Sequence, residues 1–288
     1  MAYPYLSDVV RAATGLDLPL PLPMFGLFVA LGLLIAAQCL RVELERMQRA
    51  GRIVASLPEL HAVVSNLTFV AMVSGIVGAR LFHILENLDT FVAAPMSMIL
   101  TTSGLSIFGG LVLGTLAGVL VVRRAGLPLR AFLDAAAPAM MLGYAIGRIG
   151  CQVAGDGDWG VATDIAVKPG WLPLWLWAQT YDHNIVGTLI AAPGVYPTPM
   201  YETVMSLLCF GVLWACRKHP FQPGWLFAVY MALAGVERLL IEQIRINPVL
   251  NVFGIHATQA EMIATLLIIF GLAGTFVLVH RPSRGTAC

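Results

Sequence analysis

Four arginines stand in apolar surroundings, where a charge needs a partner or a ligand. Each lies in or beside a long apolar run: Arg80, Arg148, Arg238 and Arg245. An arginine within a membrane span costs on the order of 2.5–3.5 kcal/mol, so it faces a counter-charge, a water-filled cavity or an anion. Guanidinium also forks onto phosphate better than ammonium does. The four residues therefore predict either internal salt bridges or a site for an anion such as a lipid phosphate.

Acidic residues lie close to three of these arginines in the sequence. Asp156 and Asp158 follow the run that contains Arg148. Arg238 and Glu242 are four residues apart, and Glu242 and Arg245 are three apart, so these side chains share one helix face. Residue types and spacing alone do not decide whether the carboxylates neutralise the arginines or leave some of them for a ligand.

The elements that position these residues are predicted to be membrane helices. A span needs roughly 20 mostly apolar residues, and seven runs qualify: 20–40, 63–85, 105–122, 131–153, 200–216, 225–244 and 260–280. Apolar side chains make up 58% of the chain and charged ones 11%, against about 25% charged in a soluble domain. We expect an all-α polytopic membrane protein with one integral membrane domain, 1–288. Thr258, followed by Glu261, predicts the N-cap of the last span.

The basic residues between spans predict the orientation, because cytoplasmic loops are rich in lysine and arginine. Eleven of the 17 follow spans one, three, five and seven: Arg41, Arg46, Arg49, Arg52, Arg123, Arg124, Arg130, Arg217, Lys218, Arg281 and Arg284. The N-terminus is then outside, without a signal peptide, and the C-terminus is cytoplasmic. Residues 154–199 form a periplasmic loop between spans four and five. Its four tryptophans suit the headgroup layer, and a solvated loop is the alternative.

Charge and cysteine usage exclude other classes. A net charge of +1 lacks the basic stripe of a nucleic-acid-binding protein. The five cysteines form no C-x-x-C pair and no Cys/His spacing typical of a metal site. We therefore expect no nucleic-acid partner, no metal and no organic cofactor.

Five ordered blocks of the sequence resemble the prolipoprotein diacylglyceryl transferase family. The most specific is GRIG at 147–150, followed by DGDWG at 156–160. The others are GARL at 78–81, GLSIFGG at 104–110, YPTPMYE at 196–202 and ERLLIEQIR at 237–245. The family's seven-span topology with the N-terminus outside agrees with the charge count.

The resemblance implies an activity and a set of residues. Such enzymes transfer the diacylglyceryl group of phosphatidylglycerol to the lipobox cysteine thiol of a prolipoprotein and release glycerol phosphate. They act at the outer leaflet of the bacterial inner membrane, among the membrane lipids. By matching position, Arg148 and Arg238 would bind the phosphate and stabilise the transition state. The substrate-binding and supporting residues would be Arg80, Gly160, Tyr201, Glu202, Glu242 and Arg245.

Two departures from the family pattern leave the proton acceptor open. Phe108 stands where the family commonly has a histidine, a proposed general base, and Cys151 stands where it has asparagine. Asp156 and Asp158 are the candidate catalytic bases, and the arginines could instead lower the pKa of the thiol. The remaining alternatives are a divergent paralogue with another acceptor or a lipid-binding role, and an anion or lipid-phosphate transporter.

Overall fold

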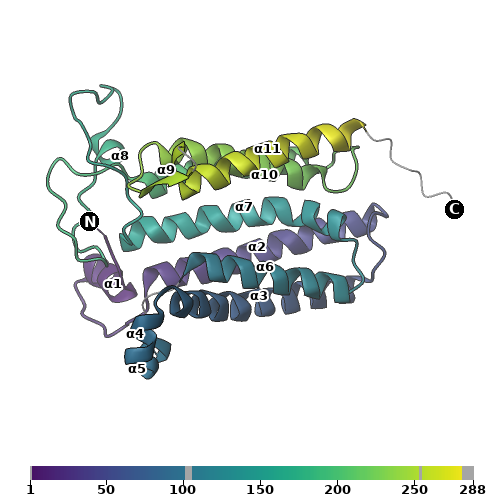
Figure 1. The fold of residues 1–288 in the computed structure, drawn as a ribbon, viewed down its shortest axis with the longest axis horizontal. Coiled ribbons are helices and arrows are strands. Elements are labelled where there is room, and N and C mark those ends of the chain that lie inside the picture. The colour runs from purple at the N-terminus through teal and green to yellow at the C-terminus, as the bar shows by residue number, and fades with distance from the viewer. Residues whose placement is uncertain (1, 101–105, 253–254, 281–288) are drawn as a thin grey trace. The chain divides into compact units, whose positions relative to one another are not determined.

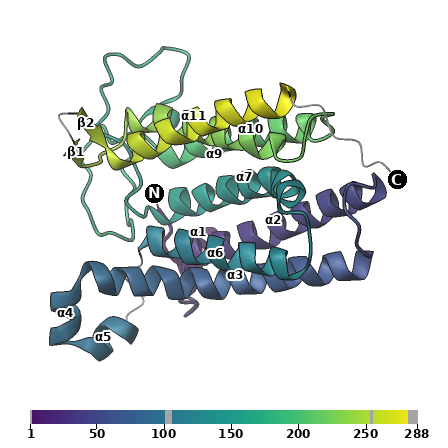
Figure 2. The same ribbon diagram turned by 45° about the vertical axis from the view of Figure 1, so that its right-hand side comes forward.

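The computed structural model describes residues 2–100, 106–252 and 255–280, which are mainly helical (Figures 1 and 2). The helices are α1 Leu6–Thr14, α2 Met24–Arg49, α3 Leu57–Glu86, α4 Leu88–Ala93, α5 Pro95–Leu100, α6 Ile107–Arg124, α7 Leu129–Ala154, α8 Leu174–Trp177, α9 Thr198–Cys216, α10 Trp225–Glu242 and α11 Gln259–His280. The strands are β1 Val249–Val252 and β2 Ile255–Thr258. Gly104, Leu105, Arg281 and Arg284, which enter the predictions above, lie outside the described residues.

Five of these helices are long and apolar enough to cross a membrane: α2, α3, α7, α9 and α11. The chain is thus a polytopic, mainly helical membrane protein. The two other predicted spans lie largely on α6 and α10, which have 18 residues each. Seven spans and their orientation stay predictions. One element was not predicted, an antiparallel hairpin in which Val249 pairs with Thr258 and Val252 with Ile255.

The chain divides into two compact units, Met1–Ala36 with Ala136–Cys288, and Ala37–Ala135. In the second unit, α3 and α6 pack through glycines. A Cβ atom on Gly78 would collide with the carbonyl oxygen of Gly109, and one on Gly110 would lie 3.1 Å from the carbonyl oxygen of Gly75. Small residues let two backbones approach in this way.

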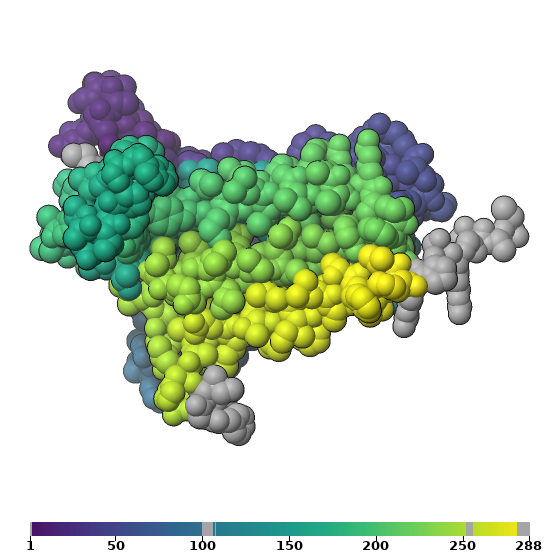
Figure 3. Space-filling model, turned by 90° about the horizontal axis from the view of Figure 1, so that it is seen from above, coloured from purple at the N-terminus to yellow at the C-terminus, as the bar shows by residue number. Residues whose placement is uncertain are grey.

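The first unit has its core where α7, α9 and α10 meet. Ala137 and Met141 of α7, Leu213 of α9 and Leu226 of α10 are fully buried together. Figure 3 shows α10 and α11 side by side. A Cβ on Gly271 of α11 would lie 2.5 Å from the backbone nitrogen of Ala232 in α10. This packing fixes the helices that carry the charged residues.

Thr258 caps α11 as the sequence predicts. The backbone nitrogen of Glu261 donates to Thr258 Oγ1 at 3.1 Å, and the backbone nitrogen of Thr258 donates to Glu261 Oε2 at 2.8 Å. This reciprocal pair satisfies two donors that a helix start leaves open.

The segment between α7 and α9 is an irregular but hydrogen-bonded loop. The backbone nitrogen of Gln179 donates to Val195, and that of Val195 donates back to Gln179, both at 3.0 Å. Its tryptophans divide into two kinds. Trp159 lies 5.2 Å from the Tyr181 ring, between ring centroids, and Trp177 Nε1 donates to the loop backbone, whereas Trp171 is 83% exposed. The loop therefore has a packed base and an exposed aromatic edge.

Candidate active site

Four segments of the first unit bring charged side chains together. Arg148 comes from the last two turns of α7, Asp158 from the α7–α9 loop and Glu202 from the first turns of α9. Arg238 and Glu242 come from the end of α10, and Arg245 follows it. We call these six residues, three arginines and three carboxylates, the arginine–carboxylate cluster.

Arg148 is held on most sides. Its Nε lies 3.0 Å from the hydroxyl of Tyr144 and 3.1 Å from Glu202 Oε2. Its Nη1 donates to Asp158 Oδ2 and lies 3.5 Å from Cys151 Sγ. Among the described residues, none forms a hydrogen bond or an ion pair with its second terminal nitrogen, Nη2. Two of its five N–H donors are therefore available to a ligand.

Glu202 is the centre of the cluster. It is 1% exposed, and its carboxylate lies 3.1 Å from Arg148 Nε and 3.5 Å from an Nη1 nitrogen of both Arg238 and Arg245. A buried carboxylate is tolerated only when opposite charges and hydrogen bonds compensate its lost hydration. Three guanidinium groups supply that compensation here, and Glu202 in turn fixes their positions.

The ion pair predicted from helix spacing is present. Arg238 Nη2 lies 2.8 Å from Glu242 Oε2, one helix turn away. The other oxygen of Glu242 accepts hydrogen bonds from Thr258 Oγ1 at 2.5 Å and Asn247 Nδ2 at 2.7 Å. The helix cap of α11 is therefore joined directly to the cluster.

Asp158 connects the loop to two arginines. Besides Arg148, its carboxylate accepts from Arg245 Nη2 at 2.5 Å. Burial raises the pKa of Asp158, but Arg148 and Arg245 outweigh burial and hold that pKa below its usual value. Its backbone carbonyl accepts from Thr198 Oγ1 at 2.5 Å. Asp158 is thus an ionised member of the cluster.

Gly160 allows the loop to lie against the chain that follows α10. Its backbone nitrogen donates to Tyr196 at 2.9 Å, and the next nitrogen, of Val161, donates to Ile244 at 2.8 Å. A Cβ on Gly160 would lie 2.5 Å from the carbonyl oxygen of Ile244, too close for any other residue without a backbone shift. This close approach brings the loop next to Arg245.

Asp156 lies beside the cluster and, among the described residues, forms no ion pair with its arginines. Its Oδ1 accepts from the backbone nitrogen of Asp158 at 3.2 Å. Ligand atoms of Cys151, Asp156 and Asp158 lie within 4.8 Å of one another, a donor set that could hold a metal ion. Arg148 already contacts two of the three residues, and its positive charge opposes a cation there.

Two predicted site residues donate hydrogen bonds to backbone carbonyls. Tyr201 donates its hydroxyl to the carbonyl of Leu176 at 2.5 Å, which connects α9 to α8. Arg80 belongs to the unit Ala37–Ala135, where its Nη1 donates to the carbonyl of Met98 at 3.1 Å. That Arg80 takes part in substrate binding stays a prediction.

Sequence reasoning missed Tyr144. Its hydroxyl donates to Glu202 Oε1 at 3.2 Å while accepting from Arg148, and its ring centroid lies 5.1 Å from the Arg148 guanidinium carbon. The signal was available, since Tyr144 precedes Arg148 by four residues and so shares its helix face.

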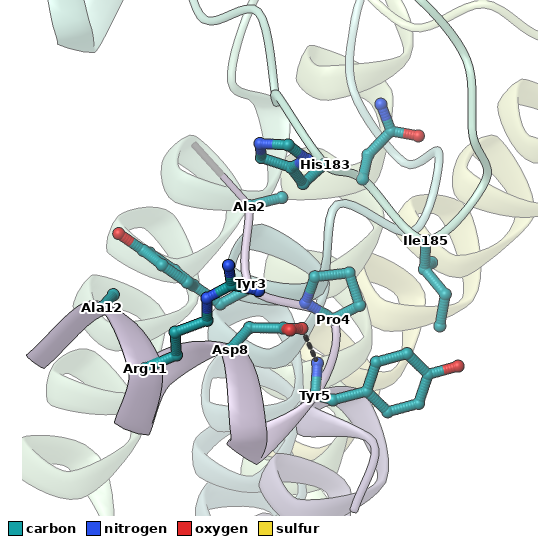
Figure 4. A pocket seen from close by; sticks show the side chains of 10 residues that line it. Ala2, Tyr3, Pro4, Tyr5, Asp8, Arg11, Ala12, His183 and Ile185 are labelled. Carbon is teal, nitrogen blue, oxygen red and sulfur yellow. Dashed lines mark hydrogen bonds between the residues drawn. The ribbon is translucent and has the colours of Figure 1, made fainter. Parts of the chain in front are cut away.

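A cavity of about 760 Å³ lies beside α1 (Figure 4). Residues 2–5, 8, 11, 12 and 183–185 line it. Figure 4 shows the hydrogen bond from the Tyr5 nitrogen to Asp8 Oδ2 at its edge. None of the predicted site residues is among these lining residues.

Comparisons with known proteins agree on one family. The family model described as prolipoprotein diacylglyceryl transferase matches residues 12–277. Proteins named phosphatidylglycerol–prolipoprotein diacylglyceryl transferase are similar to this chain. The one from Corynebacterium diphtheriae is 29% identical over 88% of both chains, and that from Corynebacterium efficiens is 32% identical over 83% of this chain and 72% of its own. One from Leptospira interrogans is 31% identical over 77% of this chain and 71% of its own.

Proposed function

Because this chain belongs to the prolipoprotein diacylglyceryl transferase family, we propose that it transfers the diacylglyceryl group of phosphatidylglycerol to a prolipoprotein. The names of its relatives state this donor and this acceptor. The acceptor group is the thiol of the lipobox cysteine, the product is a thioether, and glycerol phosphate is released. No metal or organic cofactor takes part.

The observation that carries the proposal is the open donor set on the arginine–carboxylate cluster. Three carboxylates balance three arginines, so the cluster does not attract a phosphate by net charge. Among the described contacts, however, none reaches Arg148 Nη2 or Arg238 Nε. A lipid phosphate can therefore be bound by these N–H groups while the carboxylates hold both guanidinium groups in place.

The same donors serve the chemical step. As the bond between the diacylglyceryl carbon and the phosphate oxygen breaks, negative charge grows on the leaving phosphate. Preorganised N–H donors in a water-poor site stabilise such developing charge. We assign this role to Arg148 and Arg238, and the support of their geometry to Glu202, Glu242 and Arg245.

Of the two carboxylates predicted as bases, Asp158 is the weaker candidate. Each of its oxygens is held by an arginine, and its lowered pKa makes it a poor proton acceptor. Asp156 forms no described ion pair with an arginine and stays a candidate for the general base.

The proposed topology has seven helices in the bacterial inner membrane: the five long apolar helices together with α6 and α10. The N-terminus is periplasmic, as the eleven basic residues on the opposite side favour. The α7–α9 loop and the cluster are then at the outer leaflet. This is where the lipobox cysteine of a translocated prolipoprotein becomes accessible.

The test uses purified protein, phosphatidylglycerol vesicles and a lipobox peptide. We expect the peptide to gain the mass of a diacylglyceryl group while glycerol phosphate is released, and vesicles of phosphatidylethanolamine alone to give no product. Arg148→Ala and Arg238→Ala should each abolish most turnover, whereas Arg11→Ala, at an exposed ion pair, should not. Phosphatidylglycerol binding without product would favour a lipid-binding protein, and flux of lipid phosphate without product would favour a transporter.

A further inference from the structure

The transfer needs a group that removes the thiol proton, and the position where the family commonly has a histidine is Phe108. We propose that Tyr144 is a catalytic residue, whose hydroxyl takes the proton of the attacking thiol and passes its own proton to Glu202. This inference rests on the proposed function and adds the path of the proton.

The hydrogen bonds of Tyr144 define the path. Its hydroxyl accepts from Arg148 Nε at 3.0 Å and donates to Glu202 Oε1 at 3.2 Å. A phenolic oxygen has one hydrogen and two lone pairs, so one lone pair remains for a further donor such as S–H. The hydroxyl hydrogen already points to Glu202, which, unlike Asp158, accepts no described hydrogen bond from an arginine and can receive the proton.

Exposure separates the two ends of this path. Glu202 is 1% exposed and lies within 3.5 Å of three arginines, whereas Tyr144 is 39% exposed. A substrate thiol can therefore approach the tyrosine and not the carboxylate. Tyr144 gives the buried Glu202 contact with the reacting atoms without opening the site to water.

Tyr144 also has the right neighbour. It contacts Arg148 both through its hydroxyl and through its ring face, and the open Nη2 of the same guanidinium is the proposed phosphate donor. The thiol and the breaking carbon–oxygen bond are thereby brought to one place. Asp156, the rival base, has no described hydrogen bond or ion pair with an arginine. Its Oδ1 accepts a hydrogen bond from the backbone nitrogen of Asp158.

The atoms balance without a further reactant. The cysteine sulfur forms a bond to the diacylglyceryl carbon, and the bond from that carbon to the phosphate oxygen breaks. The thiol proton moves to Tyr144 as the proton of Tyr144 moves to Glu202. Glu202 then returns a proton through Tyr144 to the glycerol phosphate that leaves, so the cluster ends in its starting state.

Two peptides that differ in one atom test the proposal. One carries the lipobox cysteine, and the other carries selenocysteine, whose selenol is ionised at neutral pH and needs no proton acceptor. With Tyr144→Phe, which keeps the ring against Arg148, we expect turnover of the cysteine peptide to fall about 100-fold, as loss of acid–base catalysis does. Turnover of the selenocysteine peptide and the KM for phosphatidylglycerol should stay close to those of the wild type.

The alternatives give other patterns. Equal losses with both peptides would mean that Tyr144 only positions Arg148, and full activity with both would mean that it has no role; either result overturns the proposal. A loss confined to the cysteine peptide in Asp156→Asn, with Tyr144→Phe unaffected, would assign the base to Asp156. Tyr230→Phe, a hydroxyl removed from the core around α10, is the matched control. Wild-type protein without thioether product would instead refute the proposed function.

A second variant covers the case in which Tyr144→Phe does not fold. Replacing Tyr144 by 3-fluorotyrosine keeps the ring and the hydroxyl but makes the phenol more acidic. The pH profile of turnover should then shift with the cysteine peptide alone. A profile that stays in place would overturn the proposal.

Discussion

Replacing Glu202 by glutamine removes one negative charge from the centre of the cluster at almost constant volume. The wild-type carboxylate is 1% exposed and lies within 3.5 Å of Arg148, Arg238 and Arg245. After Glu202→Gln, three guanidinium groups share two carboxylates, those of Asp158 and Glu242. The cluster then carries an uncompensated positive charge in a buried place.

The size of the effect follows from these contacts. The shortest contact, Arg148 Nε to Glu202 Oε2 at 3.1 Å, is an ion pair in which Glu202 Oε2 accepts no hydrogen bond, so the loss does not include the about 1.5–3 kcal/mol of a charge-assisted hydrogen bond. Arg238 and Arg245 each keep another carboxylate, so their loss is partial. Breaking a buried ion pair on one side costs about 3–5 kcal/mol. We therefore expect a loss near the lower end, about 3 kcal/mol.

Thermal unfolding in detergent measures this loss. At roughly 2–4 °C per kcal/mol for a chain of this size class, Tm should fall by about 6–12 °C. Glu261→Gln is the matched control, because that carboxylate accepts the backbone nitrogen of the Thr258 cap and a cap contributes only about 1 kcal/mol. A Tm for Glu202→Gln as high as that of Glu261→Gln would refute the central position given to Glu202.

Three further predictions concern other parts of the structure. Because the pKa of Asp158 is lowered in the folded protein, its ion pairs stabilise the fold fully above the unfolded pKa, about 3.9, and this contribution is lost as pH falls through the lower folded pKa. The Tm difference between wild type and Asp158→Asn should therefore be constant from pH 7 to 5 and shrink below pH 4. A Tm difference that persists to pH 3 would contradict this. Thr258→Ala should lower stability by about 1–2 kcal/mol by removing the α11 cap, clearly more than Thr265→Ala, whose hydroxyl bonds to its own helix; equal Tm values would argue against the cap. Gly78→Ala should reduce the yield of folded protein and its Tm because its Cβ meets the α6 backbone, while Gly75→Ala, with no atom within 4 Å of its Cβ, should be tolerated; two similar variants would show that α3 and α6 do not pack as described.

Local patterns in the sequence predicted several features of this structure. Arg238 and Glu242 pair because a helix brings residues four apart onto one face. Thr258 and Glu261 form their reciprocal cap from two side chains three residues apart. Long apolar runs predicted the helices because few polar groups interrupt them. Each of these features depends only on residues that are close together in the sequence and belong to one helix.

Pairings between distant segments could not be predicted in the same way. Asp158 meets Arg245 across 87 residues, and nothing in either neighbourhood specifies the other. The family resemblance placed Glu202 among the supporting residues, but only the packing of α7, α9 and α10 shows that it joins three arginines. The hairpin that precedes α11 was also missed, since it depends on pairing of two four-residue strands.

In the proposed function, the guanidinium fork of Arg148 binds the lipid phosphate and stabilises it as it leaves. The most direct measurement is the rate of thioether formation by Arg148→Lys at saturating phosphatidylglycerol, beside wild type. Lysine keeps the positive charge but lacks the guanidinium fork. In the wild type this fork contacts Tyr144, Glu202 and Asp158 while its Nη2 stays open to a ligand. We expect a fall of about 100-fold or more, as for the loss of a preorganised donor. A rate close to that of the wild type would contradict it.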